Sequence, residues 1–158
     1  MRLRRAGSRD SLLTITDPAL GDDVPLGNAK KTVMLESSNG IKVGVIGLVE
    51  REWLDTINSL PPNLIYKSAS ATAKELVPRL REEGAEIVIA VTHQREPNDN
   101  KLAEKTPEGL IDIIVGGHDR KHPSIQLRGG GSLAMSTCQH QLSIFKLVKY
   151  LTLTTIHI

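Results

Sequence analysis

Cysteine is nearly absent from this sequence, since Cys138 is the only one among 158 residues. A single cysteine excludes an internal disulfide and any zinc site built from several cysteines. Aromatic residues are also scarce, at 3% of the chain. A hydrophobic core must therefore be built mainly from Ile, Val and Leu.

Long hydrophobic runs and an excess of one charge are missing as well. No apolar run approaches the ~18 residues of a membrane-spanning helix, and the N-terminus lacks the apolar stretch of a signal peptide. We therefore expect no membrane partner and, by default, a cytoplasmic protein. The net charge of +2 creates no strong field for nucleic acid, so no nucleic-acid partner is expected either.

The one dense basic cluster lies within the first nine residues and is interpreted as a solvated terminus. It consists of Arg2, Arg4, Arg5 and Arg9. A nucleic-acid-binding arm and a targeting signal are the alternatives for this cluster.

The chain is typical of one globular domain or a large part of one, with 39% hydrophobic and 24% charged residues. Residues 1–30 show no periodicity and are predicted to form an irregular or disordered segment. Order is expected over residues 31–158. There, Asn39-Gly40 separates two runs rich in β-formers and predicts a hairpin.

Strands and helices alternate along the ordered part, which predicts an α/β fold with a mixed sheet. A helix with a kink or break at Pro78 and an end at Gly84 is expected. The later strands are expected to be antiparallel. The predicted strands are 32–37, 41–48, 86–92, 110–115, 124–127 and 132–136, and the predicted helices are 68–83 and 98–105. The last twenty residues fit either strand or helix.

Two histidines follow two of the buried strands. His93 comes directly after one strand, and His118 follows another after two glycines, which would let the backbone turn sharply. Ligands of open α/β sheets bind at the carboxyl ends of the strands, where two imidazoles could share a zinc, manganese, iron or nickel ion. The alternative is a pair of surface or capping histidines, with an exposed polar loop after His93.

The surrounding strings resemble calcineurin-like metallophosphoesterases of the 5′-nucleotidase family, including fungal ones. The string Ile-Val-Ile-Ala-Val-Thr-His ending at His93 is similar to that family's strand followed by Thr-His. The string Asp-Ile-Ile-Val-Gly-Gly-His-Asp from Asp112 resembles its Asp-hydrophobic-Gly-Gly-His-Asp-His motif, and Gly47 to Trp53 belongs to the same likeness. The resemblance covers residues from about Pro25 to Arg120.

The resemblance implies that His93 and His118 bind one divalent metal ion of the Mn, Zn, Fe or Mg class. It also implies a nucleotide or another phosphate monoester as substrate. The family has a further histidine where this chain has Arg120, which cannot ligate a metal. Arg120 could instead bind a phosphate oxygen, and His122 could replace the missing ligand.

The family's early motifs, Asp-x-His, Gly-Asp-x-x-Asp and Gly-Asn-His, are absent, and with them the bridging aspartate and the catalytic histidine. We therefore interpret the chain as the C-terminal half of a phosphoesterase domain whose N-terminal half is missing. A truncated gene, a relic and a piece needing a complementary segment all fit this pattern. The alternative to a hydrolase is a catalytically dead scaffold or metal-binding fragment, which could self-associate through an exposed sheet.

Overall fold

The sheet begins with the hairpin that the Asn39-Gly40 pair predicts. In the computed structural model, which describes residues 14–118, 125–127 and 133–136, β1 (Thr32–Glu36) pairs antiparallel with β2 (Lys42–Val49). Ser37 accepts a hydrogen bond from the Gly40 N–H (3.0 Å) and donates its own N–H to the Ile41 carbonyl (2.9 Å). Within the loop of residues 38–40, Gly40 alone adopts a positive φ, at 82°. The hairpin is confirmed, with one left-handed residue in a three-residue loop.

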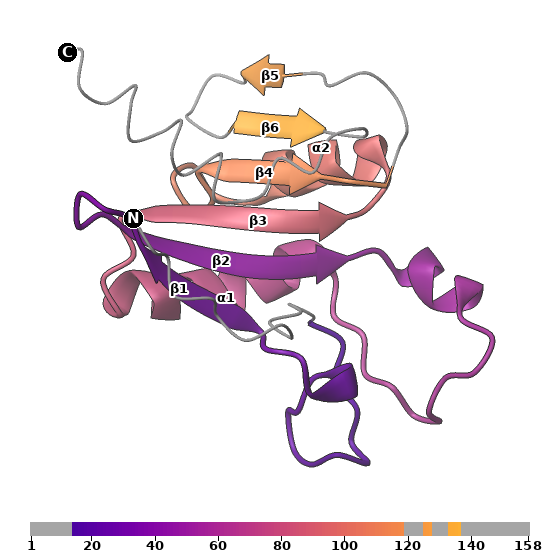
Figure 1. Cartoon of the computed structure of the whole chain (residues 1–158). Helices are drawn as coiled ribbons and strands as arrows, with labels where there is room; N and C mark the ends of the chain where they lie inside the picture. Colours follow the sequence, from indigo (N-terminus) through magenta and orange to yellow (C-terminus); the bar gives the residue numbers. More distant parts are fainter. Residues whose placement is uncertain (1–13, 119–124, 128–132, 137–158) are drawn as a thin grey trace.

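The strands form one six-stranded sheet in the order β1-β2-β3-β4-β6-β5 (Figure 1). The four inner strands are parallel: β2, β3 (Ile87–His93), β4 (Ile113–Gly116) and β6 (Leu133–Ser136). The edge strands β1 and β5 (Ile125–Leu127) are antiparallel to their neighbours. The α/β fold with a mixed sheet is confirmed.

The expectation that the later strands are antiparallel is right for β5 with β6 and wrong for β4 with β6. The chain passes from β4 out to the edge, forms β5, and returns as β6 between them. Strand β5 runs opposite to β4, so β6, which is antiparallel to β5, runs parallel to β4. Four parallel strands therefore have their carboxyl ends at the same edge of the sheet.

Two helices, α1 (Ala69–Glu82) and α2 (Glu96–Lys105), cover one face of the sheet (Figure 1). The core on this face joins apolar side chains of α1 to those of the central strands, among them Leu76, Val77, Leu80, Ile46, Val88 and Ile114. Gly44 lets the helix approach β2 closely, because a Cβ there would lie 3.1 Å from Leu80 and 3.2 Å from Ala85. No helix within the described residues is long and apolar enough to cross a membrane.

The opposite face of the sheet carries a second apolar cluster of buried side chains. Its members are Val43, Val45, Ile89 and Ile113, none of them more than 4% exposed. Strand β2 is thus buried on both faces along nearly its whole length, as its continuous apolar run predicts. Self-association through an exposed sheet stays a prediction.

The start and the end of α1 follow from its sequence. The Ser68 hydroxyl accepts a hydrogen bond from the Ala71 N–H (3.4 Å) and caps the first turn. At the other end Gly84 has φ 98°, and the Ala85 N–H donates to the Leu80 carbonyl (2.8 Å). This is the glycine-terminated helix end that the sequence predicts.

Pro78 neither splits nor ends α1, which contradicts the predicted break. The helix is continuous from Ala69 to Glu82, and Pro78 lies on its exposed side. A proline removes one N–H donor from the helix. On the exposed side, the carbonyl left without that donor can be hydrated by water instead.

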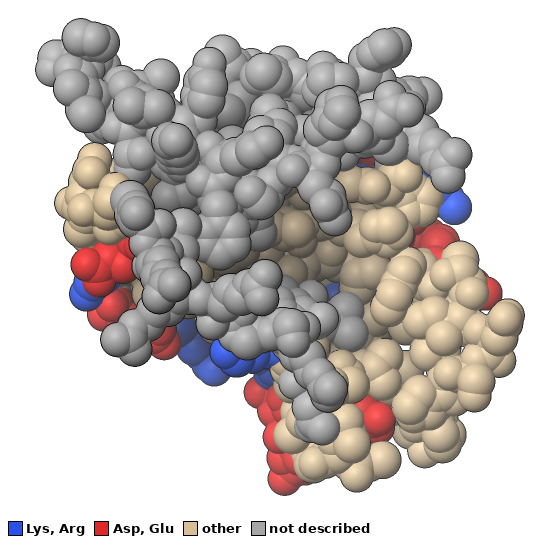
Figure 2. Space-filling model, viewed as in Figure 1, with Lys and Arg blue, Asp and Glu red and all other residues tan. Residues whose placement is uncertain are grey.

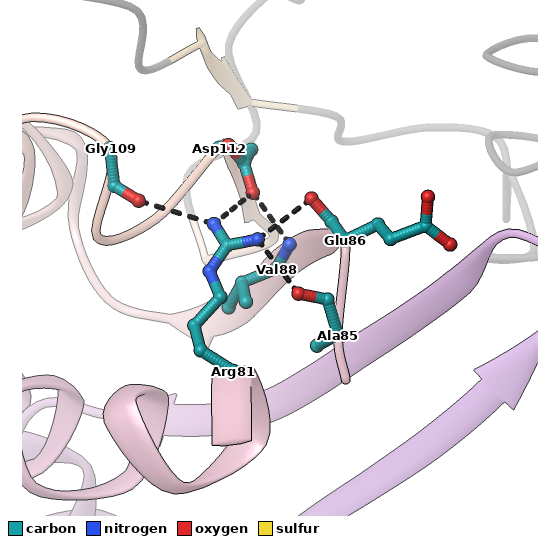
Figure 3. A network of polar contacts seen from close by, with 6 residues as sticks. All are labelled: Arg81, Ala85, Glu86, Val88, Gly109 and Asp112. Atoms are coloured by element: carbon teal, nitrogen blue, oxygen red, sulfur yellow. Dashed lines mark hydrogen bonds and ion pairs between the residues drawn. The ribbon is translucent and has the colours of Figure 1, made fainter. Parts of the chain in front are cut away.

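Arg81, in the last turn of α1, joins the helix to the beginnings of β3 and β4 (Figure 3). Its guanidinium donates to three carbonyls and one carboxylate, namely Ala85 O (3.1 Å), Glu86 O (2.7 Å), Gly109 O (3.1 Å) and Asp112 Oδ2 (2.7 Å). The same Asp112 oxygen accepts the Val88 N–H at 2.6 Å. Asp112 therefore links two strands near their amino ends, away from the strand ends that carry the histidines.

Residues 14–30 lack long elements, but they pack against the rest of the chain. Ile15 is fully buried, and Thr16 exchanges two backbone hydrogen bonds with Ile65 (3.0 and 3.1 Å). A short 3-10 turn, η1 (Leu26–Asn28), follows, and η2 (Arg51–Thr56) comes directly after β2. The division at residue 30 stays a prediction.

Charges of both signs lie next to one another on the surface of the described residues (Figure 2). Glu75 shows this on α1, because it pairs with Lys67 at 2.7 Å and lies 3.9 Å from Arg79. The hydrogen bond from Lys67 lowers the pKa of the Glu75 carboxyl. Asp23 likewise pairs with Lys31, whose hydrogen bond lowers the pKa of Asp23. Mixed charge of this kind agrees with the small net charge.

Candidate metal centre

His93 and His118 lie side by side at the carboxyl ends of adjacent strands. His93 is the last residue of β3, and His118 follows β4 by two residues, with Thr92 and Gly116 paired across the two strands. The ring centroids are 5.0 Å apart and the ring planes are tilted by 54°. His93 is exposed and His118 is partly exposed. The expected juxtaposition is observed, and joint metal binding by the two rings stays a prediction.

Glu50, at the end of β2, is a third functional group at this edge of the sheet. Its side chain is only 3% exposed, and its Oε1 lies 3.8 Å from His118 Nε2. Its Oε2 accepts hydrogen bonds from the Arg95 N–H (3.0 Å) and from Asn98 Nδ2 (2.7 Å). The Glu50 N–H points to the His93 carbonyl at 3.4 Å. A buried carboxylate beside the His118 imidazole makes this edge favourable for a cation.

Sequence reasoning did not single out Glu50 as a site residue. The signal was available, because Glu50 follows the apolar β2 run directly. The rule that selects side chains at the carboxyl ends of parallel strands selects Glu50 as well as the two histidines. The sequence does not show that β2 lies next to β3 in the sheet, which is what brings Glu50 to the histidines.

The segment that follows His93 is not the exposed polar loop that was the alternative to a metal site. Asp99 is 6% exposed, and its Oδ1 accepts hydrogen bonds from Thr92 Oγ1 (2.7 Å) and Gln94 Nε2 (3.0 Å). Helix α2 begins at Glu96, two residues earlier than expected, and places Asp99 in its first turn. The free-energy cost of burying this carboxylate is offset by its hydrogen bonds and by the helix dipole.

The glycines before His118 have a different role from the predicted sharp turn. Neither Gly116 nor Gly117 is among the residues with positive φ. A Cβ on Gly116 would instead collide with Asp99 Oδ2. Glycine at this position makes room for the Asp99 carboxylate beneath the β4 end, and so helps to hold the segment that follows His93.

We therefore expect Gly116→Ala to destabilise the protein by about 1–3 kcal/mol, the usual range for overpacking a filled site. Gly117→Ala is the matched control, because its Cβ would meet the Thr92 carbonyl oxygen at an ordinary 3.7 Å and is expected to change stability by less than ~0.5 kcal/mol. Urea unfolding of both variants measures the difference. Equal stabilities would contradict the proposed packing role of Gly116.

A hollow of about 270 Å³ lies beside Glu50, on the side of α1 and α2. Its lining includes Tyr66, Asn98 and Lys101, but neither histidine. Burial raises the pKa of the Tyr66 hydroxyl, and the carboxylates of Glu52 and Glu50 add to the effect. Because neither histidine lines it, this hollow is separate from the imidazole pair.

The described residues contain no group of three or more His, Cys, Asp or Glu side chains placed to hold a metal ion. Arg120 and His122, the predicted phosphate-binding and substitute-ligand residues, lie outside the described residues. Two imidazoles 5.0 Å apart can each reach a common ion with bonds of ~2.0–2.1 Å.

No protein-family model matches this chain. A 5′-nucleotidase of Diplobatis ommata is 32% identical over 116 residues, which are 68% of this chain and 19% of that protein. Thermus thermophilus sulfate thiohydrolase SoxB shares the fold with a TM-score of 0.63 at 24% identity, over 79% of this chain and 22% of SoxB. The calcineurin-like phosphoesterase YfkN of Bacillus subtilis has a TM-score of 0.58 at 22% identity, over 79% of this chain and 45% of the YfkN chain. The chain thus spans about one fifth of the length of the Diplobatis ommata protein.

Proposed function

We propose, from the premise that this chain belongs to the 5′-nucleotidase-like metallophosphoesterases, that it provides two metal ligands of a phosphoric monoester hydrolase. His93 and His118 are the two ligands, and they bind the same divalent ion. The substrate class that we propose is the nucleotide phosphate monoester, because the Diplobatis ommata relative is named a 5′-nucleotidase.

The observation that carries the proposal is the 5.0 Å separation of the two imidazole rings at adjacent strand ends. Imidazole nitrogen suits zinc, manganese and iron better than magnesium, which prefers oxygen ligands. The buried Glu50 carboxylate, 3.8 Å from His118, adds negative charge that favours a cation. Zinc, manganese and iron are therefore the ions to test first.

A bound ion would supply Lewis-acid stabilisation of the phosphoryl group and lower the pKa of a coordinated water. The residues of this chain would hold and orient that ion. His93 and His118 bind it through neutral ring nitrogens, and the hydrogen bonds from Arg95 and Asn98 to Glu50 fix the surrounding loop. Rigid strand ends are suited to this task, because small displacements of a catalytic group lower its rate strongly.

A catalytically inactive metal-binding fragment is the second candidate function. It is favoured by the donor count, because catalytic zinc sites usually have three protein ligands, and the described residues form no such group of three. The two functions differ in turnover and agree in metal binding.

The experiment is to purify the chain, add excess Mn²⁺ or Zn²⁺, and measure metal binding and phosphate release from AMP and from an aryl phosphate. Both candidate functions require metal binding that is lost in His93→Ala and His118→Ala. Phosphate release that is lost in the same variants assigns hydrolysis to this chain. Metal binding without release supports the inactive fragment, and absence of histidine-dependent metal binding overturns both.

A further inference from the structure

We propose that Glu50 is a positioning residue that keeps the proton of neutral His118 on Nε2 and so leaves Nδ1 to bind a cation. This inference rests on the proposed function, because it assigns a role in the same metal centre. Glu50 would act through His118 and is not itself a ligand, in agreement with the lack of a three-residue metal group among the described residues.

The first step of the argument is that Glu50 is held in place. It follows β2 directly, and its Oε2 receives two hydrogen bonds, from the Arg95 N–H (3.0 Å) and from Asn98 Nδ2 (2.7 Å). Both donors belong to the segment that follows His93. A side chain fixed by two hydrogen bonds and 3% exposed has little freedom to turn away.

The second step is that the other oxygen faces His118. Glu50 Oε1 lies 3.8 Å from His118 Nε2 and 3.7 Å from Arg95 Nε. This separation is longer than a hydrogen bond, and a movement of about 1 Å would bring it to hydrogen-bonding distance. At 3.8 Å the carboxylate already favours an N–H at the facing Nε2 position electrostatically, so this preference is expected in the metal-free protein as well.

The third step is the chemistry of a ligating histidine. Such a histidine commonly donates its second ring N–H to a carboxylate, which sets the tautomer and the ring orientation. A carboxylate oxygen only accepts hydrogen bonds. Glu50 Oε1 therefore favours a proton on His118 Nε2, and the lone pair of the neutral ring is then on Nδ1.

Glutamine at position 50 separates this role from simple packing, because it keeps the shape of the side chain. Arg95 N–H and Asn98 Nδ2 both donate at the Oε2 position, so the amide oxygen is expected to take that position. The amide NH₂ then faces His118 Nε2 and requires an acceptor there. We expect the neutral His118 ring in Glu50→Gln to move its proton from Nε2 to Nδ1.

The test is ¹⁵N NMR of the histidine rings in metal-free protein, at a pH of about 8 where an ordinary imidazole is neutral. The expected result is an Nε2–H majority for His118 in the wild type and an Nδ1–H majority in Glu50→Gln. Glu52→Gln is the matched control, since Glu52 is exposed and its replacement removes the same charge nearby. An Nδ1–H majority in the wild type, or the same tautomer in wild type and Glu50→Gln, would overturn the proposal.

Metal affinity gives the second measurement, by calorimetric titration with Zn²⁺ or Mn²⁺. Loss of an outer partner of a ligand weakens metal binding by about 10–100-fold, which we expect for Glu50→Gln and not for Glu52→Gln. Complete loss of binding without a tautomer change would make Glu50 a direct ligand and overturn the positioning role. A third outcome is that Glu50→Gln changes the His118 tautomer while the wild type binds no metal. That outcome would refute the proposed function and leave the coupling between Glu50 and His118 standing.

Discussion

His93→Ala and His118→Ala are each expected to lower the affinity for Zn²⁺ or Mn²⁺ by more than the roughly 10–100-fold that follows the loss of an outer partner. Each replacement removes one of the two nitrogen donors that lie 5.0 Å apart. A single remaining imidazole then holds the ion no better than an exposed histidine does. The double variant should bind neither ion measurably.

Calorimetric titration of each variant measures this loss. Thermal unfolding provides a second readout, because an ion that binds only the folded state raises the melting temperature. That rise should be present in the wild type and absent in the variants. His140→Ala controls for adventitious binding by a histidine outside both strand-end motifs.

The alanine variants themselves should remain folded. His93 is exposed, and surface substitutions of this kind usually change stability by less than ~0.5 kcal/mol. Wild-type affinity in either single variant would remove that histidine from the metal centre. A loss of affinity that follows a loss of fold would be recognised by circular dichroism before any titration.

Arg81→Ala is expected to destabilise the protein by about 1.5–3 kcal/mol, the range for hydrogen bonds that involve charged groups. The replacement removes all four bonds of the guanidinium and leaves the Asp112 carboxylate with the Val88 N–H alone among the contacts of Figure 3. Arg81→Lys should lose most of the same stability, because an ammonium group cannot reproduce the planar fork of donors.

Urea unfolding of Arg81→Ala and Arg79→Ala provides the matched comparison. Arg79 lies in the same helix turn, with its side chain 64% exposed and 3.9 Å from Glu75. An exposed pair of this kind contributes at most about 1 kcal/mol. Equal stabilities of the two variants would show that the network in Figure 3 does not hold the helix end to the strands.

The order and type of the secondary-structure elements could be predicted because they depend on local chemistry. The Asn39-Gly40 turn, the Ser68 cap and the Gly84 helix end all act within a few residues of themselves, and the structure has each of them. The break predicted at Pro78 is wrong, because local chemistry alone does not set the cost of a proline in a helix. Its cost depends on which side of the helix faces the solvent, and that is decided by packing.

The position of the two histidines at neighbouring strand ends was predicted, and their metal binding stays a prediction. The pattern of a buried strand followed by histidine identified His93 and His118, because the carboxyl ends of parallel strands meet at one edge. Glu50 and Asp99 were missed as parts of this edge. The burial of Glu50 depends on hydrogen-bond partners 45 and 48 residues away in the sequence. The burial of Asp99 depends on the space left by Gly116.

The sequence by itself determined the α/β fold class, the first hairpin, the helix ends and the two histidines at strand ends. Each of these follows from short-range hydrogen bonding, backbone preference or hydrophobic periodicity, which neighbouring residues set. The strand order, the parallel path of β6 and the buried position of Glu50 beside His118 were decided only by the tertiary structure. They arise from contacts between distant segments, and no local pattern specifies which segment will provide the partner.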